Sequence, residues 1–129
     1  MTVGRGRTPG PGGATYSDAV VVDLPGARWI YVAGQTARQS NGIPADVAGQ
    51  SEACFAQLEA ILGEWGAVLA DLVQITVYLT DLEQYPSYAA VRSRLLADAP
   101  PSSAAVGVAS LLGGALVEIS GVAVTEPPG

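Results

Sequence analysis

Apolar runs and alternating patterns along the chain predict five β-strands. They cover residues 16–23, 28–33, 72–79, 103–110 and 115–124. Pro25-Gly26 separates the first two runs with a turn, so we expect these two strands to form a hairpin. The last two runs are joined by the turn Leu111-Leu112-Gly113-Gly114, and we expect both strands to be buried.

Apolar residues spaced three, four and seven apart predict two helices between the strands. Asp46 is placed to cap the first helix and Gly66 to end it. The second helix is expected after Asp81, with Pro86 in its first turn, and Pro100-Pro101 ends it. The apolar face of the first helix consists of Val47, Cys54, Leu58, Ile61, Leu62 and Trp65.

The predicted element order is β-β-α-β-α-β-β, which indicates an α+β fold with one mixed sheet and both helices on one face. We expect one domain over residues 14–125, a flexible N-terminal tail over residues 1–13 and a short C-terminal tail over residues 126–129. No third helix remains to cover the second face of the sheet. That face is therefore expected to be buried by self-association.

Composition limits the class of partner. The chain has 129 residues, of which 49% are hydrophobic, and this is enough for one packed core. The net charge is −6, with six Arg and no Lys, which argues against nucleic acid as a partner. No run of 18 apolar residues and no signal-peptide pattern is present, so we expect a soluble cytoplasmic protein that does not contact membranes.

The missing residue types limit the chemistry. Without His, the chain lacks Ser-His-Asp and Cys-His arrangements and histidine metal ligands, and without Lys it cannot form a Schiff base through a side chain. Cys54 is the single cysteine, and its apolar helical position favours core packing over a nucleophilic role. Proton transfer is left to carboxylates, hydroxyls and water.

Glu118 is a carboxylate within the apolar last strand, where desolvation is costly. It either lies on a wet face or caps a neighbouring backbone group, or it acts as a general acid or base. Alternation puts Glu118 on one face with Leu116, Ser120 and Val122. On the preceding strand a run of small residues leaves room for a close neighbour or a ligand, and it comprises Ser103, Ala105, Gly107 and Ala109.

The chain resembles the Rid family (reactive intermediate deaminase, also called YjgF-like) between about residues 16 and 124. The resemblance rests on Tyr16-Ser17-Asp18-Ala19-Val20, Val32-Ala33-Gly34-Gln35, Ala45-Asp46-Val47 with Gln50, Thr76-Val77-Tyr78-Leu79-Thr80-Asp81-Leu82, Val106-Gly107-Val108-Ala109 and Val117-Glu118-Ile119. It implies a chorismate-mutase-like fold that forms a homotrimer, with clefts between adjacent subunits. It also implies catalysis without a metal or organic cofactor.

In family members that hydrolyse imines or enamines, an Arg at the start of the penultimate strand binds the substrate carboxylate, and a Glu on the last strand positions a water. The resemblance assigns the Glu to Glu118, whereas Ser103 stands at the Arg position and Ala105 at a position often held by a thiol. A serine replaces a charged two-pronged contact by one neutral hydrogen bond. Arg38 either reaches the cleft in its place or is a solvated loop residue.

Two functions follow from these features. The first is an enzyme that acts on a small reactive imine or enamine, by hydrolytic deamination or by dehydrative cyclisation in a biosynthetic pathway of secondary metabolism. Glu118 would be its general acid or base, Ser103 would hydrogen-bond the substrate, Tyr16 and Tyr31 would line the cleft, and backbone amides near Ala105 would polarise the reacting group. The alternative is a non-catalytic trimer that binds a metabolite or regulates an enzyme.

Overall fold

The computed structural model describes residues 3–37 and 42–127, and within them the order of elements confirms the predicted α+β fold. The helices are α1 (Val47–Gly63) and α2 (Tyr85–Leu96). The strands are β1 (Gly4–Pro9), β2 (Ser17–Leu24), β3 (Ala27–Thr36), β4 (Leu72–Leu79), β5 (Ser102–Gly107) and β6 (Val117–Thr125).

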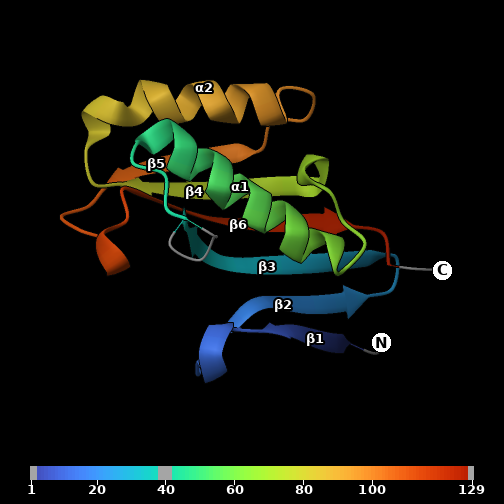
Figure 1. The fold of residues 1–129 in the computed structure, drawn as a ribbon. Coiled ribbons are helices and arrows are strands. Elements are labelled where there is room, and N and C mark those ends of the chain that lie inside the picture. Colours follow the sequence, from blue (N-terminus) through green and yellow to red (C-terminus); the bar gives the residue numbers. More distant parts are fainter. Residues whose placement is uncertain (1–2, 38–41, 128–129) are drawn as a thin grey trace.

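All six strands form one sheet in the order β1-β2-β3-β6-β4-β5. Every neighbouring pair is antiparallel except β4 and β5, which run parallel because α2 connects them. Both helices cover the same face, with α1 across β3 and β6 and α2 beyond it (Figure 1). The prediction of a mixed sheet with two helices on one face is confirmed.

Alternation along β6 divides the two faces of the sheet. Val117, Ile119 and Ala123 are buried in the core beneath the helices. The side chains between them, Glu118 and Ser120, point to the opposite face, which no element of the described chain covers. We call this second surface the open face.

Polar side chains at the start of α1 fix the helix to the sheet. Asp46 is the N-cap, and its Oδ1 accepts a hydrogen bond from the amide of Gly49 at 2.8 Å, as the sequence predicts. Gln50 donates to the carbonyl of Pro44 at 2.9 Å and accepts from the amide of Leu116 at 2.9 Å. The buried Gln50 amide therefore ties the first turn of α1 to the entry of β6.

The N-terminal segment differs from its prediction as a flexible tail, because Gly4–Pro9 forms the edge strand β1 against β2. Trp65, just after α1, holds this strand: its indole nitrogen donates to the hydroxyl of Thr8 at 2.8 Å. Thr8 in turn donates to the Glu64 carboxylate at 2.8 Å. Glycine-rich composition conceals such a strand, since its stability comes from a partner far away in the sequence.

The prediction of a buried strand over residues 103–110 is also wrong. β5 ends at Gly107, and each of its residues is exposed. It pairs with β4 on one side only, so its other edge is unpaired within the described chain. Because β4 lies between β5 and β6, the two C-terminal strands are not neighbours.

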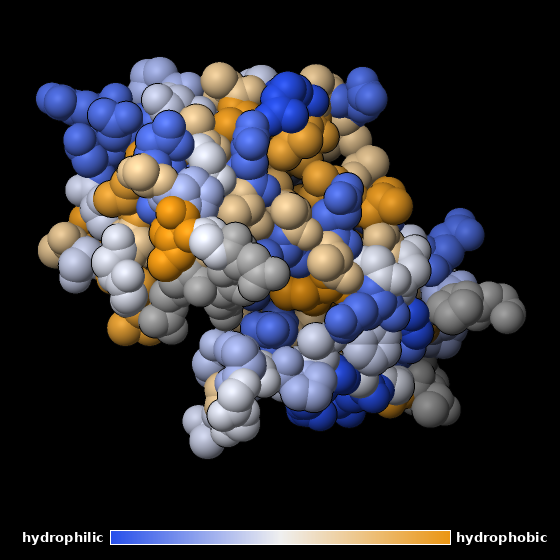
Figure 2. Space-filling view, viewed as in Figure 1, coloured by the Kyte–Doolittle hydropathy of each residue, from blue (hydrophilic) through white to orange (hydrophobic). Residues whose placement is uncertain are grey.

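On the helix side of the molecule, hydrophobic and hydrophilic residues are interspersed over the surface (Figure 2). Among residues 3–37 and 42–127, no helix is long and apolar enough to cross a membrane. Nor do these residues contain a group of three or more His, Cys, Asp and Glu side chains that could hold a metal ion.

Candidate functional site

Glu118 occupies the middle of the open face, in the third strand from the β5 edge of the sheet. Its Cα pairs with Thr36 of β3 on one side and with Tyr78 of β4 on the other. The side chain is half-buried, and no described residue donates a hydrogen bond to its carboxylate. Within residues 3–37 and 42–127, Glu118 therefore caps no backbone group, and its carboxylate lies beside a tyrosine.

Gly34 creates the space for this carboxylate. A β-bulge interrupts the pairing of β3 with β6 between Val32 and Gln35. A Cβ atom at Gly34 would lie 2.6 Å from Oε2 of Glu118, so the carboxylate rests directly against the backbone of the bulge. The glycine is thus required for the observed position of Glu118.

Cys54 of α1 lies on the core side, close enough to interact with the charge of Glu118. Its thiol is fully buried and donates to the carbonyl of Gln35 at 3.1 Å. Burial, and then the negative charge of Glu118, raise the pKa of Cys54 to about 12, and a backbone hydrogen bond with Ala37 offsets part of this rise. The thiol therefore stays protonated, which confirms core packing over a nucleophilic role.

Ser103 lies on the other face of the sheet. Its Cα pairs with Ile75, a core residue, so its side chain points to the helix face. Ala105, paired with Val77, shares this face. The structure of the chain therefore does not bring Ser103 and Ala105 together with Glu118.

A cavity of about 440 Å³ opens beside Ser103 at the end of α2. It is lined by Arg92, Ser93, Leu96, Ala97, Pro100, Pro101 and Ser103. The Arg92 guanidinium lies over the ring of Tyr88, 5.6 Å from its centroid, and donates to the hydroxyl of Tyr85 at 2.7 Å. The hydrogen bond with Tyr85 is the main cause of a raised pKa at Arg92, so this cation is permanent.

The remaining predicted residues are dispersed. Tyr31 lies on the open face opposite Val122 and is 48% exposed. Tyr16 is exposed and lines a different surface cavity, next to the end of β1, whose lining does not include Glu118. Arg38 lies outside the described residues.

Tyr78 is a candidate that sequence reasoning missed. Side chains alternate over residues 72–79, so the side chain of Tyr78 lies on the other face of the strand from the buried Val77 and Leu79, away from the core. Its position beside Glu118 depends on β4 pairing with β6, and that strand order cannot be read from the alternation alone.

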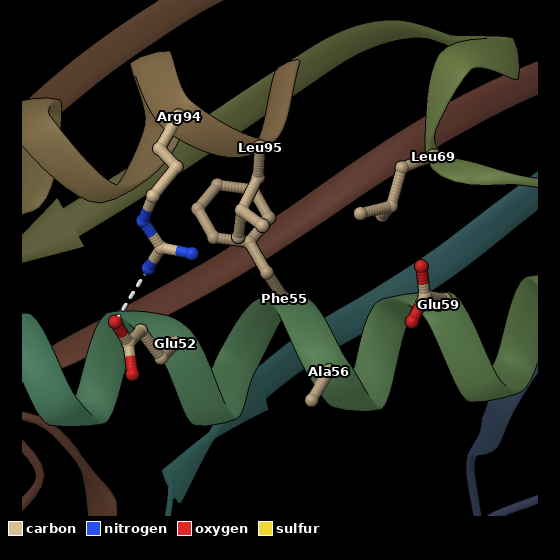
Figure 3. Close-up of a pocket in the computed structure, with 7 residues that line it drawn as sticks. All are labelled: Glu52, Phe55, Ala56, Glu59, Leu69, Arg94 and Leu95. Atoms are coloured by element: carbon tan, nitrogen blue, oxygen red, sulfur yellow. Dashed lines mark hydrogen bonds and ion pairs between the residues drawn. The ribbon is translucent and has the colours of Figure 1, made fainter.

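A smaller cavity, of about 170 Å³, lies between the two helices and is lined by Glu52, Phe55, Ala56, Glu59, Leu69, Arg94 and Leu95 (Figure 3). Arg94 reaches from α2 to Glu52 of α1, with an Nη2 to Oε1 distance of 2.5 Å. No predicted site residue lines this cavity. We attribute it to the packing of the helices.

Comparison with known proteins gives concordant results. The family model described as "Endoribonuclease L-PSP" matches residues 10–125. A RutC family protein of Pyrococcus abyssi is 32% identical over 123 residues, covering 93% of each chain. A 2-iminobutanoate/2-iminopropanoate deaminase of Rattus norvegicus is 32% identical over 128 residues, covering 97% of this chain and 90% of the relative.

The fold is similar to that of a solved member of the YjgF/YER057c/UK114 family from Mycobacterium tuberculosis. The two structures superpose with a TM-score of 0.80 at 29% identity, covering 95% of this chain and 100% of the other.

Proposed function

The chain belongs to the endoribonuclease L-PSP family, also called the Rid or YjgF family, and from this premise we propose that it is an enzyme acting on a small reactive imine or enamine. A relative that covers nearly the whole chain is named as a deaminase of two 2-imino acids. The proposed reaction is hydrolytic deamination, or a dehydrative cyclisation that uses the same groups.

The state of Glu118 is the observation that carries this proposal. A half-buried carboxylate that accepts no hydrogen bond from any residue of the described chain contributes little to the fold. The same features suit a general acid or base, because the carboxylate can accept a proton from water and return it to the leaving amine. Tyr78, whose Cα pairs with that of Glu118 on the neighbouring strand, would line the same site.

The site is proposed to lie between subunits. Ser103 points to the helix face and Glu118 to the open face, so one cleft can hold both only if two subunits contribute to it. Self-association through the open face would also cover Tyr31 and Val106, which are 48% and 40% exposed in the subunit. We propose a homotrimer with three such clefts, as the family resemblance implies.

Substitution of the carboxylate tests the function. Glu118→Gln keeps the shape of the side chain and removes its titrating proton, so it should abolish imine hydrolysis by the purified protein. Glu59→Gln is the matched control, because Glu59 is a carboxylate on α1 outside the proposed site. Imines of a small neutral amino acid and of its decarboxylated amine are the substrates to compare. Unchanged turnover in Glu118→Gln would refute the assigned role.

A non-catalytic, metabolite-binding protein is the second candidate. It is favoured by Ser103, a neutral residue where the resemblance leads one to expect an Arg. The same assay separates the two functions, since this candidate predicts no turnover by the wild-type protein on either imine.

A further inference from the structure

Two of the hydrogen-bond donors that line the cavity beside Ser103 are Arg92 and Ser103 itself, and the buried hydroxyl of Tyr88 lies next to both. The first is Arg92, which forms no ion pair with any carboxylate in the described chain, unlike Arg28 and Arg94. None of the seven lining residues is acidic. A half-buried guanidinium that hydrogen-bonds a tyrosine hydroxyl and has no carboxylate partner in the described chain is a favourable position for an anionic ligand.

The second donor is the hydroxyl of Tyr88. This residue is completely buried, and its hydroxyl forms no hydrogen bond of normal geometry with any described residue. Ser103 and Arg92 are the polar neighbours that act on it, so the hydroxyl is directed towards the residues that line the cavity. Burial raises the pKa of Tyr88, and the protonated hydroxyl is able to donate.

The third donor is the hydroxyl of Ser103 on β5, which lines the cavity. Most of the other lining residues are apolar, namely Leu96, Ala97, Pro100 and Pro101, and the two prolines carry no amide hydrogen. A guanidinium and a hydroxyl beside a mostly apolar lining match a small molecule with one carboxylate and a short hydrocarbon body. A volume of about 440 Å³ accommodates a ligand of this size.

We propose that Arg92, assisted by the hydroxyls of Tyr88 and Ser103, forms a carboxylate-binding subsite on α2. The proposal rests on the proposed function and specifies its substrate. Ser103 on β5 is neutral, and Arg92 on α2 supplies the positive charge in its place. The imine that the enzyme acts on therefore carries a carboxylate. In this arrangement Arg92 determines specificity and Glu118 of an adjacent subunit supplies the proton transfer.

Titration of the full chain with 2-oxobutanoate, followed by calorimetry and by amide chemical shifts, tests the subsite. Shifts are expected at Arg92, Ser93 and Ser103, and not at Glu52 in the cavity between the helices. Arg92→Gln should weaken binding by about tenfold or more, because a charge-assisted contact is lost. 2-Oxobutanamide, which is neutral and similar in shape, should bind at least tenfold more weakly than the acid.

Arg94→Gln is the matched control, since Arg94 is two residues away on the same helix but pairs with Glu52. It should leave 2-oxobutanoate binding unchanged. Arg92 packs over Tyr85 and Tyr88, so its substitution also affects the packing of α2. Tyr88→Phe is therefore the second variant. It removes the buried hydroxyl next to Arg92 and Ser103 while it keeps the ring, and it should weaken binding severalfold. Wild-type affinity in Arg92→Gln, or no binding by the wild type, would overturn the subsite.

The outcome is separable from that of the proposed function. Loss of turnover in Glu118→Gln with unchanged binding in Arg92→Gln would reject the subsite alone. Loss of binding in Arg92→Gln with unchanged turnover in Glu118→Gln would reject the catalytic role of Glu118 alone.

Discussion

The indole of Trp65 lies directly against the backbone of Gly6, so that a Cβ atom on this glycine would be 2.6 Å from the ring. This contact joins the edge strand β1 to the end of α1, the element that also carries Cys54 and Gln50. Trp65 supports Arg28 as well: the guanidinium lies 5.6 Å from the ring centroid and forms a bidentate ion pair with Asp23. One aromatic side chain thus contacts β1 and also packs against Arg28 of the β2-β3 hairpin.

Gly6→Ala is therefore expected to destabilise the protein. The added methyl group must displace a packed ring, and overpacking of this kind costs about 1–3 kcal/mol. Chemical denaturation measures the change in the free energy of unfolding. Gly4→Ala is the control on the same face of the same strand, because its Cβ would meet Asp23 at an ordinary contact distance of 3.4 Å. Equal stability of the two variants would contradict the role of Trp65.

The Trp65 contact also explains what the sequence could not predict. Strong alternation made β2, β3 and β4 predictable, and the cap at Asp46 and the apolar stripe made α1 predictable. β1 has no such pattern. Its order depends on Trp65, more than fifty residues away in the chain, and on pairing with β2.

The candidate site was predictable only in part. A carboxylate in an apolar strand identified Glu118 without any knowledge of strand order. Tyr78 required the pairing of β4 with β6, and Arg92 required the position of α2 relative to β5. Neither residue interrupts a local pattern: Tyr78 fits a strand and Arg92 fits a helix surface, so their chemistry becomes visible only once the chain is folded.

Gly34→Ala is expected to reduce activity much more than stability. The new methyl group would collide with the Glu118 carboxylate, which is the end of a flexible side chain and can move away at small cost. A displacement of about 1 Å can lower turnover by around 100-fold. Imine hydrolysis and thermal unfolding measured together check this. Gly63→Ala, which adds a methyl group where no atom lies within 4 Å, should keep full activity.

Gln50→Leu is expected to loosen the junction between α1 and β6. The substitution removes both hydrogen bonds of the amide and leaves the Leu116 amide and the Pro44 carbonyl without their partner, which costs about 1–3 kcal/mol. Denaturant unfolding measures the loss. Gln84→Leu is a suitable comparison, since Gln84 is the N-cap residue of α2 but its side chain forms no capping hydrogen bond. The free energy of unfolding is expected to change there by less than about 0.5 kcal/mol.

Cys54 predicts a dependence of stability on alkaline pH. Its pKa in the folded protein, about 12, lies above the ordinary value of 9.0 that applies to the unfolded chain. A raised pKa means that the folded state holds the proton more tightly, so this contribution to stability is complete below pH 9 and is lost as the pH rises towards 12. Cys54→Ala should show a smaller loss of unfolding free energy over that range. An identical pH profile for both proteins would contradict the assignment.

The same thiol provides a probe of the charge on Glu118. After burial, the negative charge of Glu118 is the largest cause of the raised pKa of Cys54, so Glu118→Gln should lower that pKa and increase the thiolate fraction at a given alkaline pH. Because the thiol is fully buried and inaccessible to reagents, the ultraviolet absorbance of the thiolate, followed as the pH is raised, reports this fraction in the native protein. The thiolate is expected to form at lower pH in Glu118→Gln than in the wild type, at equal global stability. The control is Glu59→Gln, which should titrate as the wild type does. An identical thiolate titration in all three proteins would contradict the electrostatic interaction of Glu118 with Cys54.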